Sequence, residues 1–306
     1  MKVLIVGSSG LVGSACKTVF STSKKVTELI TSTRKDTDLF SFEQTKRLIS
    51  SNEPDVLIIA AAKVGGIYAN NTQRVDFLLE NLKINSNLLE ACIDYPNIKI
   101  INLGSSCIYP LDASNPISES EFMNGKLEPT NSPYALAKIT AIELGRSLNI
   151  QYGHKIINLM PTNLYGPNDN FSEINSHVIP GLIRRMHNAK INNDEQFKIW
   201  GTGKPLREFL YSTDLAQFIE FIIEKDIEED LINVGSGEEV SIYDLAKLIK
   251  NVTGYKGMLI FDKNKPDGNP RKLLDISKLQ HLGWKHSTSL EVGLKNTYEW
   301  FLKNTA

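Results

Sequence analysis

The segment that decides the fold is Gly7-Ser8-Ser9-Gly10-Leu11-Val12-Gly13, which directly follows an apolar run at residues 3–6. Glycines at this spacing between a strand and a helix allow a tight turn, close approach of the backbone to a pyrophosphate and close packing of the helix on the strand. The N-terminus of that helix offers free N–H groups to the phosphates. The segment therefore predicts a dinucleotide-binding loop; an ordinary strand–turn–helix is the alternative.

Outward from this loop, short β-branched runs alternate with segments of helical spacing. The runs expected to be strands are residues 3–6, 26–30, 56–62, 98–103 and 156–160. The two longest helical segments between them are residues 78–91 and 134–152. Strands that alternate with helices indicate βαβ units and a parallel sheet covered on both faces. The predicted fold class is α/β, with a Rossmann-type doubly wound parallel sheet.

The end of the second predicted strand indicates which nicotinamide cofactor binds. NAD-binding proteins usually carry an acidic residue about 20 residues beyond the glycines, where it bonds the ribose 2′-OH. This chain has Arg34 and Lys35 there, two cations that suit a 2′-phosphate, so NADPH/NADP+ is favoured. The alternative is a solvated basic turn, and Asp36 stands nearby. The adenine is expected near Asp38 and Leu39.

Beyond about residue 162 the sequence becomes rich in Pro and Gly, with further helices expected at residues 181–189, 214–224 and 241–252. We expect an NADP(H)-binding Rossmann domain at residues 1–162. Residues 163–306 are expected to form mainly a smaller C-terminal substrate-binding lobe. A segment near residues 205–235 is expected to return to the large sheet, with its strand at 231–234.

Composition excludes several classes of protein. The 306 residues hold 34 Lys+Arg and 35 Asp+Glu, so the chain lacks the basic excess of a general nucleic-acid binder. The first apolar run stops at Gly7, too short for a signal peptide, and no apolar stretch is long enough for a membrane span. Cys16, Cys92 and Cys107 have neither disulfide nor zinc spacing, which suits a reducing compartment. We expect a cytoplasmic protein with no metal, nucleic-acid or membrane partner.

A phenol and an ammonium are expected on one helix face. Tyr134 and Lys138 are four residues apart, and Lys138 would lower the phenol pKa so that Tyr134 exchanges a proton with a carbonyl oxygen. Ser105 follows a predicted strand at the sheet edge where parallel sheets bind ligands, and would donate to the same oxygen. Cys107, two residues on, would point to the same side if the strand continued.

These motifs carry a family resemblance. The glycine loop, Ser105 and the Tyr134…Lys138 pair resemble the extended short-chain dehydrogenases/reductases. Longer stretches resemble the GDP-L-fucose synthase family of GDP-4-keto-6-deoxy-D-mannose 3,5-epimerase/4-reductases. These stretches are residues 60–67, 104–110, 160–171, 175–180, 200–203, 207–209, 265–268 and 270–272. Departures from the family pattern are Leu111, where some members carry Lys, and Ser8-Ser9, where some carry a basic residue.

The resemblance implies an NADPH-dependent GDP-sugar epimerase/reductase and assigns its site residues. Ser105, Tyr134 and Lys138 would serve reduction, and Cys107 and His177 would be the acid/base pair of epimerisation. Cofactor contacts would fall on Gly7, Ser8, Ser9, Gly10, Leu11, Val12, Gly13, Arg34, Asp38, Leu39, Leu103, Gly104, Ser105, Ser106, Tyr134, Lys138, Pro161, Thr162, Asn163, Leu164 and His177. Contacts with the GDP-sugar substrate would fall on Arg185, Trp200, Arg207, Asp267 and Lys272.

The resemblance also implies a homodimer that pairs through residues 78–91 and 132–152. We expect these stretches to carry more apolar residues than one sheet face requires: Phe77, Leu82, Leu88, Ile139, Ile142 and Leu148.

Plainer roles stay open for several of these residues. Cys107 is alternatively a small buried hydrophobe, His177 a helix-cap or core histidine, Trp200 a core residue, and the arginines solvated surface. Two other functions also stay open. One is a C4-reductase of another GDP-keto sugar, such as a modified heptose, with little or no epimerase activity. The other is a non-catalytic NADPH-sensing protein.

Overall fold

A computed structural model describes residues 1–173, 175–265 and 267–305, so Pro266 of the predicted substrate motif lies outside the described residues. Its largest sheet has six strands in the order β2-β1-β3-β4-β5-β9, and every neighbouring pair is parallel. The strands are β1 (Lys2–Val6), β2 (Glu28–Ser32), β3 (Val56–Ile59), β4 (Lys99–Leu103), β5 (Ile156–Pro161) and β9 (Leu231–Val234). The predicted α/β class with a doubly wound parallel sheet is confirmed.

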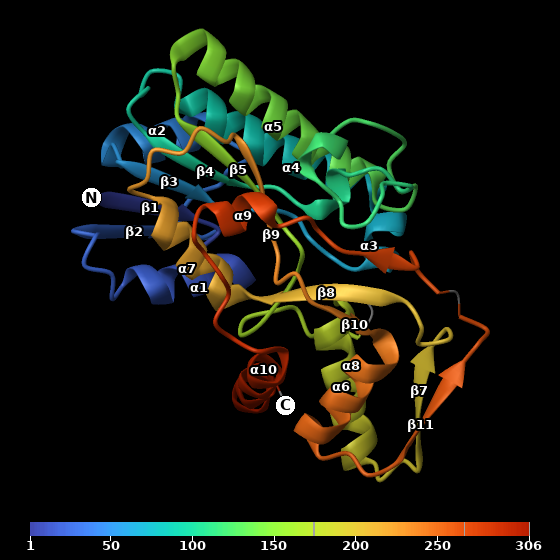
Figure 1. The fold of residues 1–306 in the computed structure, drawn as a ribbon. Coiled ribbons are helices and arrows are strands. Elements are labelled where there is room, and N and C mark those ends of the chain that lie inside the picture. Colours follow the sequence, from blue (N-terminus) through green and yellow to red (C-terminus); the bar gives the residue numbers. More distant parts are fainter. Residues whose placement is uncertain (174, 266, 306) are drawn as a thin grey trace.

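Both faces of this sheet are buried, because successive side chains of each strand point to opposite faces. In β1, Val3 and Ile5 join a core with α1 (Leu11–Phe20) and α7 (Ser212–Ile222). Leu4 and Val6 join the core on the other face, beneath α2 (Phe42–Asn52), α4 (Arg74–Ala91) and α5 (Ser132–Tyr152). Figure 1 shows α5 and α4 above the sheet and α1 and α7 below it.

The chain passes between the two lobes several times. After β5 it forms β6 (Asn163–Tyr165) and α6 (Val178–Ile191), and after β8 (Leu206–Tyr211) it returns through α7 to β9. In the smaller lobe, β8 lies between β10 (Glu239–Ser241) and β12 (Arg271–Lys272) and also pairs with β6. Strands β7 (Gln196–Trp200) and β11 (Met258–Asp262) form a separate parallel pair. The remaining elements are α3 (Ile67–Thr72), η1 (Ser106–Ile108), η2 (Glu119–Glu121), α8 (Ile242–Thr253), α9 (Ser277–His281) and α10 (Leu290–Asn304).

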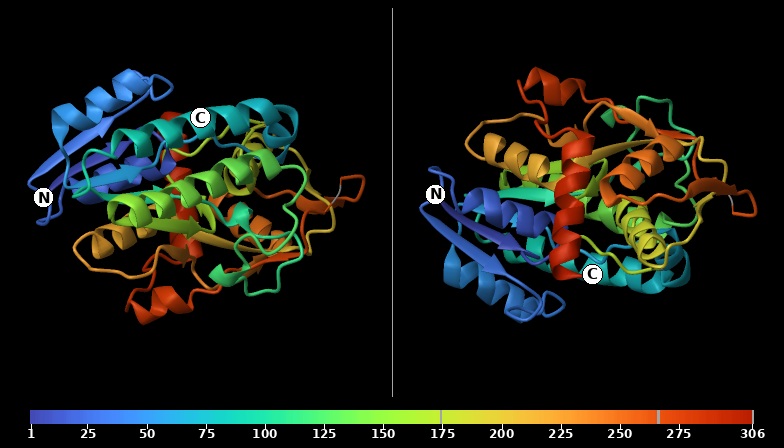
Figure 2. Two further views of the ribbon diagram at one scale, coloured as in Figure 1. Left: turned by 90° about the horizontal axis from the view of Figure 1, so that it is seen from above. Right: turned by 90° about the horizontal axis from the view of Figure 1, so that it is seen from below.

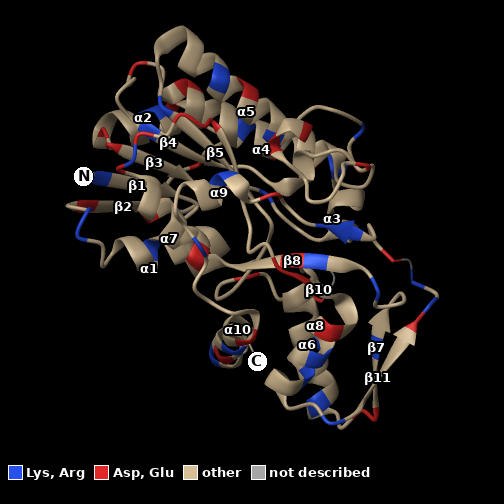
Figure 3. Cartoon of the chain, in the orientation of Figure 1, with Lys and Arg blue, Asp and Glu red and all other residues tan. Residues whose placement is uncertain are grey.

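The smaller lobe has its own core, to which α6, α8 and α10 contribute. Figure 2 shows α10 on the underside of the molecule, opposite the face covered by α4 and α5. Positions of Lys and Arg and positions of Asp and Glu are interspersed along the ribbon (Figure 3). Within the described residues, every helix is too short or too polar to cross a membrane.

The residues proposed for dimer pairing need correction. Four of them, Phe77, Leu88, Ile142 and Leu148, are buried within the subunit, because α4 and α5 pack on each other and on the sheet. The exposed apolar side chains of the two helices are instead Val75, Leu79, Leu136, Ile150 and Tyr152.

Candidate active site

The glycine loop after β1 is shaped by contacts that leave no room for side chains. Gly7 has φ +78°, and a Cβ there would lie 2.6 Å from the Cα atom of Ala61 at the end of β3. A Cβ on Gly13 would collide with the carbonyl oxygen of Gly7. Gly7 and Ser8 also donate their N–H groups to the carbonyl oxygen of Ser32, at 2.9 and 3.1 Å.

The loop leads into a helix whose first N–H groups are available to an anion. Gly10 is the N-cap of α1 and provides no side-chain cap, and Leu11 and Val12 form the first turn. A loop that lacks Cβ atoms at Gly7, Gly10 and Gly13 and leads to an uncapped helix N-terminus fits the pyrophosphate of a dinucleotide. Ser8 is buried and Ser9 is exposed in the turn.

The chain after β2 presents Arg34 to solvent. Its side chain is 76% exposed; one guanidinium nitrogen lies 3.4 Å from Glu80 Oε2, and the group lies 5.4 Å from the Phe40 ring centroid. Asp36 instead turns back and accepts from the N–H and hydroxyl of Thr33, at 2.8 and 2.7 Å. Those hydrogen bonds lower the pKa of Asp36 and keep its carboxylate in the turn. The arrangement fits a 2′-phosphate at Arg34 better than a ribose hydroxyl at Asp36.

The segment expected near the adenine is tied to α4. Asp38 Oδ1 accepts from the Phe40 N–H at 3.0 Å, and the Leu39 carbonyl accepts from Asn87 Nδ2 at 2.8 Å.

The chain changes direction where β4 ends at Leu103. At Gly104 a Cβ would collide with the Met160 side chain. Ser105 then caps the short helix η1, and its Oγ accepts from the Cys107 N–H at 3.2 Å. The strand does not continue, so the expectation that Ser105 and Cys107 share one side of a pleat was wrong. The turn formed by η1 instead brings Cys107 close to Tyr134: burial is the main cause that raises the Tyr134 pKa, and the interaction with Cys107 acts in the same direction.

Tyr134 and Lys138 lie on α5 with different partners. Lys138 is buried, and its Nζ donates to the Leu103 carbonyl at 2.6 Å while lying 5.9 Å from the Tyr134 ring centroid. Burial lowers the pKa of Lys138 to about 8. Burial also raises the pKa of Tyr134, and the hydrogen bond with Ser105 only partly opposes this. The expected lowering of the phenol pKa is therefore not found, because burial outweighs the neighbouring ammonium.

Sequence reasoning missed Asn131, the residue before α5. Its Nδ2 lies 3.5 Å from Cys107 Sγ. An Asn before a Tyr134…Lys138 pair carries no signal of its own, since its partner is 24 residues away in the chain.

His177 is the N-cap of α6, without a side-chain cap hydrogen bond. The segment before it is fixed to the loop after β3: the Gly66 N–H donates to the Asn175 carbonyl at 2.9 Å, and a Cβ on Gly66 would lie 2.5 Å from the Ser176 carbonyl oxygen. The glycines in residues 60–67 therefore help to hold the segment that carries His177. The ring keeps access to solvent, and desolvation by the surrounding protein lowers its pKa.

The predicted substrate residues gather in the smaller lobe. Trp200 is 55% exposed, which excludes the core alternative; the Arg185 guanidinium lies 4.7 Å from its ring centroid and Lys265 Nζ lies 5.6 Å from it. Asp267 accepts from the Thr202 N–H at 2.8 Å and from the Thr202 hydroxyl at 2.7 Å.

The other two predicted substrate residues lie on neighbouring strands. Arg207 on β8 is in register with Lys272 on β12. Burial lowers the pKa of Arg207, and the charge of Asp267 opposes that shift. Aromatic and cationic side chains in this arrangement can bind a base and a diphosphate.

Glu208 is a second residue that sequence reasoning missed. It is fully buried and accepts from the N–H groups of Gly237 and Leu274, at 2.7 and 3.1 Å. Its carbonyl accepts from Thr162 Oγ1 and Asn163 Nδ2, so Glu208 connects the 161–164 segment to β8. The available signal was a charged residue between Arg207 and Phe209, in one of the stretches that carry the family resemblance.

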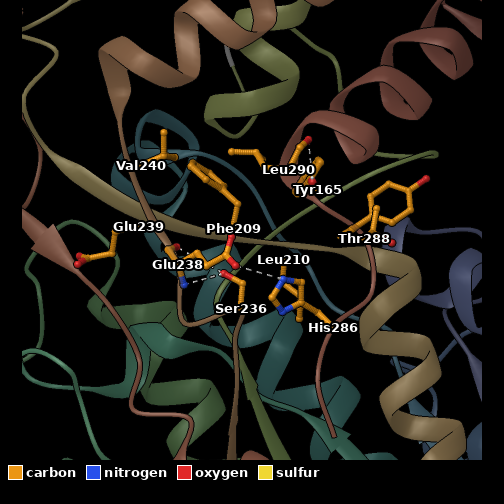
Figure 4. Close-up of a pocket in the computed structure, with 11 residues that line it drawn as sticks. Tyr165, Phe209, Leu210, Ser236, Glu238, Glu239, Val240, His286, Thr288 and Leu290 are labelled. Carbon is orange, nitrogen blue, oxygen red and sulfur yellow. Dashed lines mark hydrogen bonds and ion pairs between the residues drawn. The ribbon is translucent and has the colours of Figure 1, made fainter.

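Two pockets that open to solvent lie away from these residues. One, of about 70 Å³, is lined by residues that include Tyr165, Phe209, Glu238 and His286 (Figure 4). The other, of about 490 Å³, lies where β4 and β5 begin, at the sheet edge opposite the glycine loop. None of the predicted site residues lines either space.

The chain matches known proteins along almost its whole length. GDP-L-fucose synthase 1 of Arabidopsis thaliana is 47% identical over 303 residues, covering 99% of this chain and 94% of the relative. GDP-L-fucose synthase of Escherichia coli (strain K12) is 47% identical over 312 residues, covering 99% and 97%.

Solved structures agree with these matches. A GDP-L-fucose synthetase from Naegleria fowleri bound to NADP has a TM-score of 0.90 at 31% identity, covering 99% of this chain and 94% of that one. A GDP-6-OMe-4-keto-L-xylo-heptose reductase from C. jejuni has a TM-score of 0.89 at 32% identity, covering 99% and 98%. The model of the NAD dependent epimerase/dehydratase family matches residues 3–235, and the chain belongs to this family.

Proposed function

We propose that this chain is an NADPH-dependent enzyme that epimerises GDP-4-keto-6-deoxy-D-mannose at C3 and C5 and reduces it at C4 to GDP-L-fucose. GDP-L-fucose synthases 44–47% identical to it over nearly the full chain support this activity. The single observation that carries the proposal is the cluster of Ser105, Cys107 and Tyr134, formed where η1 and α5 meet.

The glycine loop, the α1 N-terminus and Arg34 would hold NADPH. NADPH, when bound, supplies the hydride that reduces C4. The solved relative bound to NADP supports this choice of cofactor.

The C4 ketone acidifies the protons on C3 and C5, because the resulting enolate places its charge on the C4 oxygen. Tyr134 and Ser105 would donate hydrogen bonds to that oxygen and stabilise the enolate. The raised pKa of Tyr134 keeps the phenol protonated at neutral pH, so it can give its proton to the C4 oxygen during reduction.

Cys107 and His177 would move the protons at C3 and C5. The lowered pKa of His177 leaves most of the imidazole neutral at pH 7 and makes its protonated form a stronger acid. An acid and a base on opposite faces of the sugar would permit inversion, with the enolate held by Tyr134 and Ser105 between the two transfers.

Arg185, Arg207 and Lys272 supply positive charge for a diphosphate, and exposed Trp200 supplies a stacking surface for the guanine. Asp267, held by Thr202, offers a carboxylate beside Arg207. A GDP-linked sugar fits this combination of groups.

The test is the reaction run in heavy water with purified protein, NADPH and GDP-4-keto-6-deoxy-D-mannose. We expect NADPH oxidation, deuterium at C3 and C5 and hydride at C4, read by NMR. Cys107→Ser and His177→Ala should lose deuterium before they lose hydride transfer, whereas Tyr134→Phe should slow reduction most. No consumption of NADPH with this sugar would contradict the proposal.

A second candidate is a C4-reductase of a GDP-linked heptose. Solved heptose reductases at 31–32% identity favour it. Brisk NADPH oxidation with a GDP-keto-heptose, and none of the deuterium uptake expected above, would support this alternative.

We also propose a cytoplasmic homodimer, in which residues 1–162 and a returning segment near residues 205–235 form the cofactor-binding domain, and residues 163–306 mainly form the substrate-binding lobe. Val75, Leu79, Leu136 and Ile150, exposed on α4 and α5, supply an apolar surface for pairing. Light scattering at micromolar concentration should give twice the mass of the chain; a monomer would contradict the pairing.

A further inference from the structure

Asn131 makes a contact with the sulfur that the proposed mechanism uses as an acid/base group. Its Nδ2 is 3.5 Å from Cys107 Sγ, and the large sulfur atom accepts hydrogen bonds at longer distances than oxygen does. A hydrogen bond donated to a thiolate favours the charged form, which is the form that takes a proton.

The backbone that carries this amide is fixed by side chains outside the site. The carboxylate of Glu128 accepts from the N–H groups of Thr130 and Asn131, both at 3.1 Å. Arg74 at the start of α4 donates to the Pro129 carbonyl at 2.8 Å and to the Ser132 hydroxyl at 3.1 Å. The donor therefore stands in place before the reaction, without a cost of ordering at each turnover.

The other end of the same amide is unsatisfied. Asn131 Oδ1 is buried and has no hydrogen-bond partner in the described part of the chain. A buried acceptor without a donor is unfavourable by about 1–3 kcal/mol, so its retention beside a reactive group calls for a ligand. A hydroxyl of a bound sugar has the required chemistry.

The neighbours of the sulfur leave this role to Asn131. The Lys138 ammonium donates to the Leu103 carbonyl, and the Ser105 hydroxyl oxygen accepts from the Cys107 backbone N–H. Tyr134 keeps its proton because burial raises its pKa, so it places no negative charge beside the sulfur, and its hydroxyl is hydrogen-bonded with Ser105.

We propose that Asn131 is a positioning residue for proton transfer at Cys107: its Nδ2 donates to the sulfur, and its Oδ1 accepts from a hydroxyl of the bound sugar. This rests on the proposed epimerisation. In the step, the bond from the sugar carbon to hydrogen breaks, an S–H bond forms, and the electron pair moves into the enolate at the C4 oxygen. The same carbon regains a proton, on its opposite face, when the enolate collapses.

The first test needs no sugar substrate. Alkylation of the full chain by iodoacetamide is followed against pH, with the modified residue identified by mass spectrometry. Cys16 and Cys92 are buried and their pKa values are raised to about 12, so Cys107 dominates the reaction.

Asn131→Ala should move the midpoint of this pH profile upward by about one to two pH units, the scale of one hydrogen bond to a charged group. Asn131→Asp, nearly the same shape, should move it further, because a carboxylate replaces the donor. Asn124→Ala, in an exposed turn of the same segment, is the matched control and should leave the midpoint unchanged. Unchanged midpoints in both Asn131 variants would overturn the proposal.

The second test follows deuterium uptake at C3 and C5 against NADPH oxidation. Asn131→Ala should lower deuterium uptake by about fivefold or more relative to hydride transfer, given the size of one such hydrogen bond. Equal losses of the two would overturn the assignment to proton transfer. If the unmodified protein incorporates no deuterium, the proposed epimerisation fails, and the alkylation profile still decides whether Asn131 controls the sulfur.

Discussion

The two ends of the candidate site are built from different materials. At the cofactor end, the glycine loop offers backbone N–H groups, and its shape depends on the absence of Cβ atoms at Gly7 and Gly13. At the substrate end, long side chains from three separate stretches come together around Trp200 and Arg207. Where the backbone itself forms the binding surface, almost no added atom is tolerated. Where side chains form it, we expect each lost charge to weaken binding by a limited amount.

The largest effect on binding is expected in the glycine loop, where Gly13 packs directly against the backbone of Gly7. Gly13→Ala places a methyl group against the Gly7 carbonyl, and neither partner can rotate away. We expect NADPH affinity, measured by fluorescence titration, to fall at least a hundredfold, corresponding to about 3 kcal/mol, the upper end for overpacking. Thr18→Ala, at an exposed position further along α1, is the matched control, and binding should change little.

At the substrate end, removal of one cation should weaken binding without abolishing it. Arg207→Ala should raise KM for the GDP-sugar by about ten- to a hundredfold, as for the loss of a charged hydrogen bond. Arg271→Ala on the neighbouring strand should have a much smaller effect, because Arg271 is paired with Glu239 at 2.7 Å on the surface. Steady-state kinetics of both variants checks this; equal effects would remove Arg207 from the substrate site.

Arg34 tests whether a side chain contributes to cofactor selectivity at the end of the site where the backbone binds the cofactor. Arg34→Ala should reduce the preference for NADPH over NADH by about 1–3 kcal/mol, since one charged contact with the 2′-phosphate is lost. The ratio of kcat/KM for the two cofactors is the measurement. Equal use of both cofactors by the unmodified protein would contradict the role of Arg34.

The smallest effect concerns pH and a carboxyl group in the smaller lobe. Burial raises the pKa of Asp169 to about 7. In the unfolded chain the pKa of this carboxyl group is about 3.9. Between pH 3.9 and pH 7 the folded protein therefore holds a proton on Asp169 that the unfolded chain has released. The free energy of unfolding consequently falls as the pH rises through this range. Asp169→Asn should therefore stabilise the protein at pH 8, and by less at pH 5. Urea unfolding at the two pH values checks the sign.

The parts of the fold that follow from local pattern could be predicted from the sequence. The loop from Gly7 to Gly13 and the buried runs of the large sheet have clear periodicity, and 231–234 indeed pairs with β5. The β7 and β11 pair was not predicted, because its strands are short and half exposed.

The candidate site was less predictable, because its details depend on contacts between distant segments. After Leu103 the chain forms the turn η1 where the strand was expected to continue. Burial raises the pKa of Tyr134, which was expected to be lowered. Packing of α4 on α5 buries Phe77, which was expected at a dimer interface. The sequence identified the residue types of the candidate site, but the burial and the contacts of these residues could not be predicted from it.

The position of β9 at the edge of the large sheet has a consequence for how the protein is made. One edge of β5 stays unpaired until α6, β8 and α7 have left the ribosome, because β9 follows all three in the chain. An exposed strand edge invites pairing with other chains. Synthesis of the smaller lobe therefore protects the larger one, and a chain that stops after β8 would be left open to aggregation and degradation.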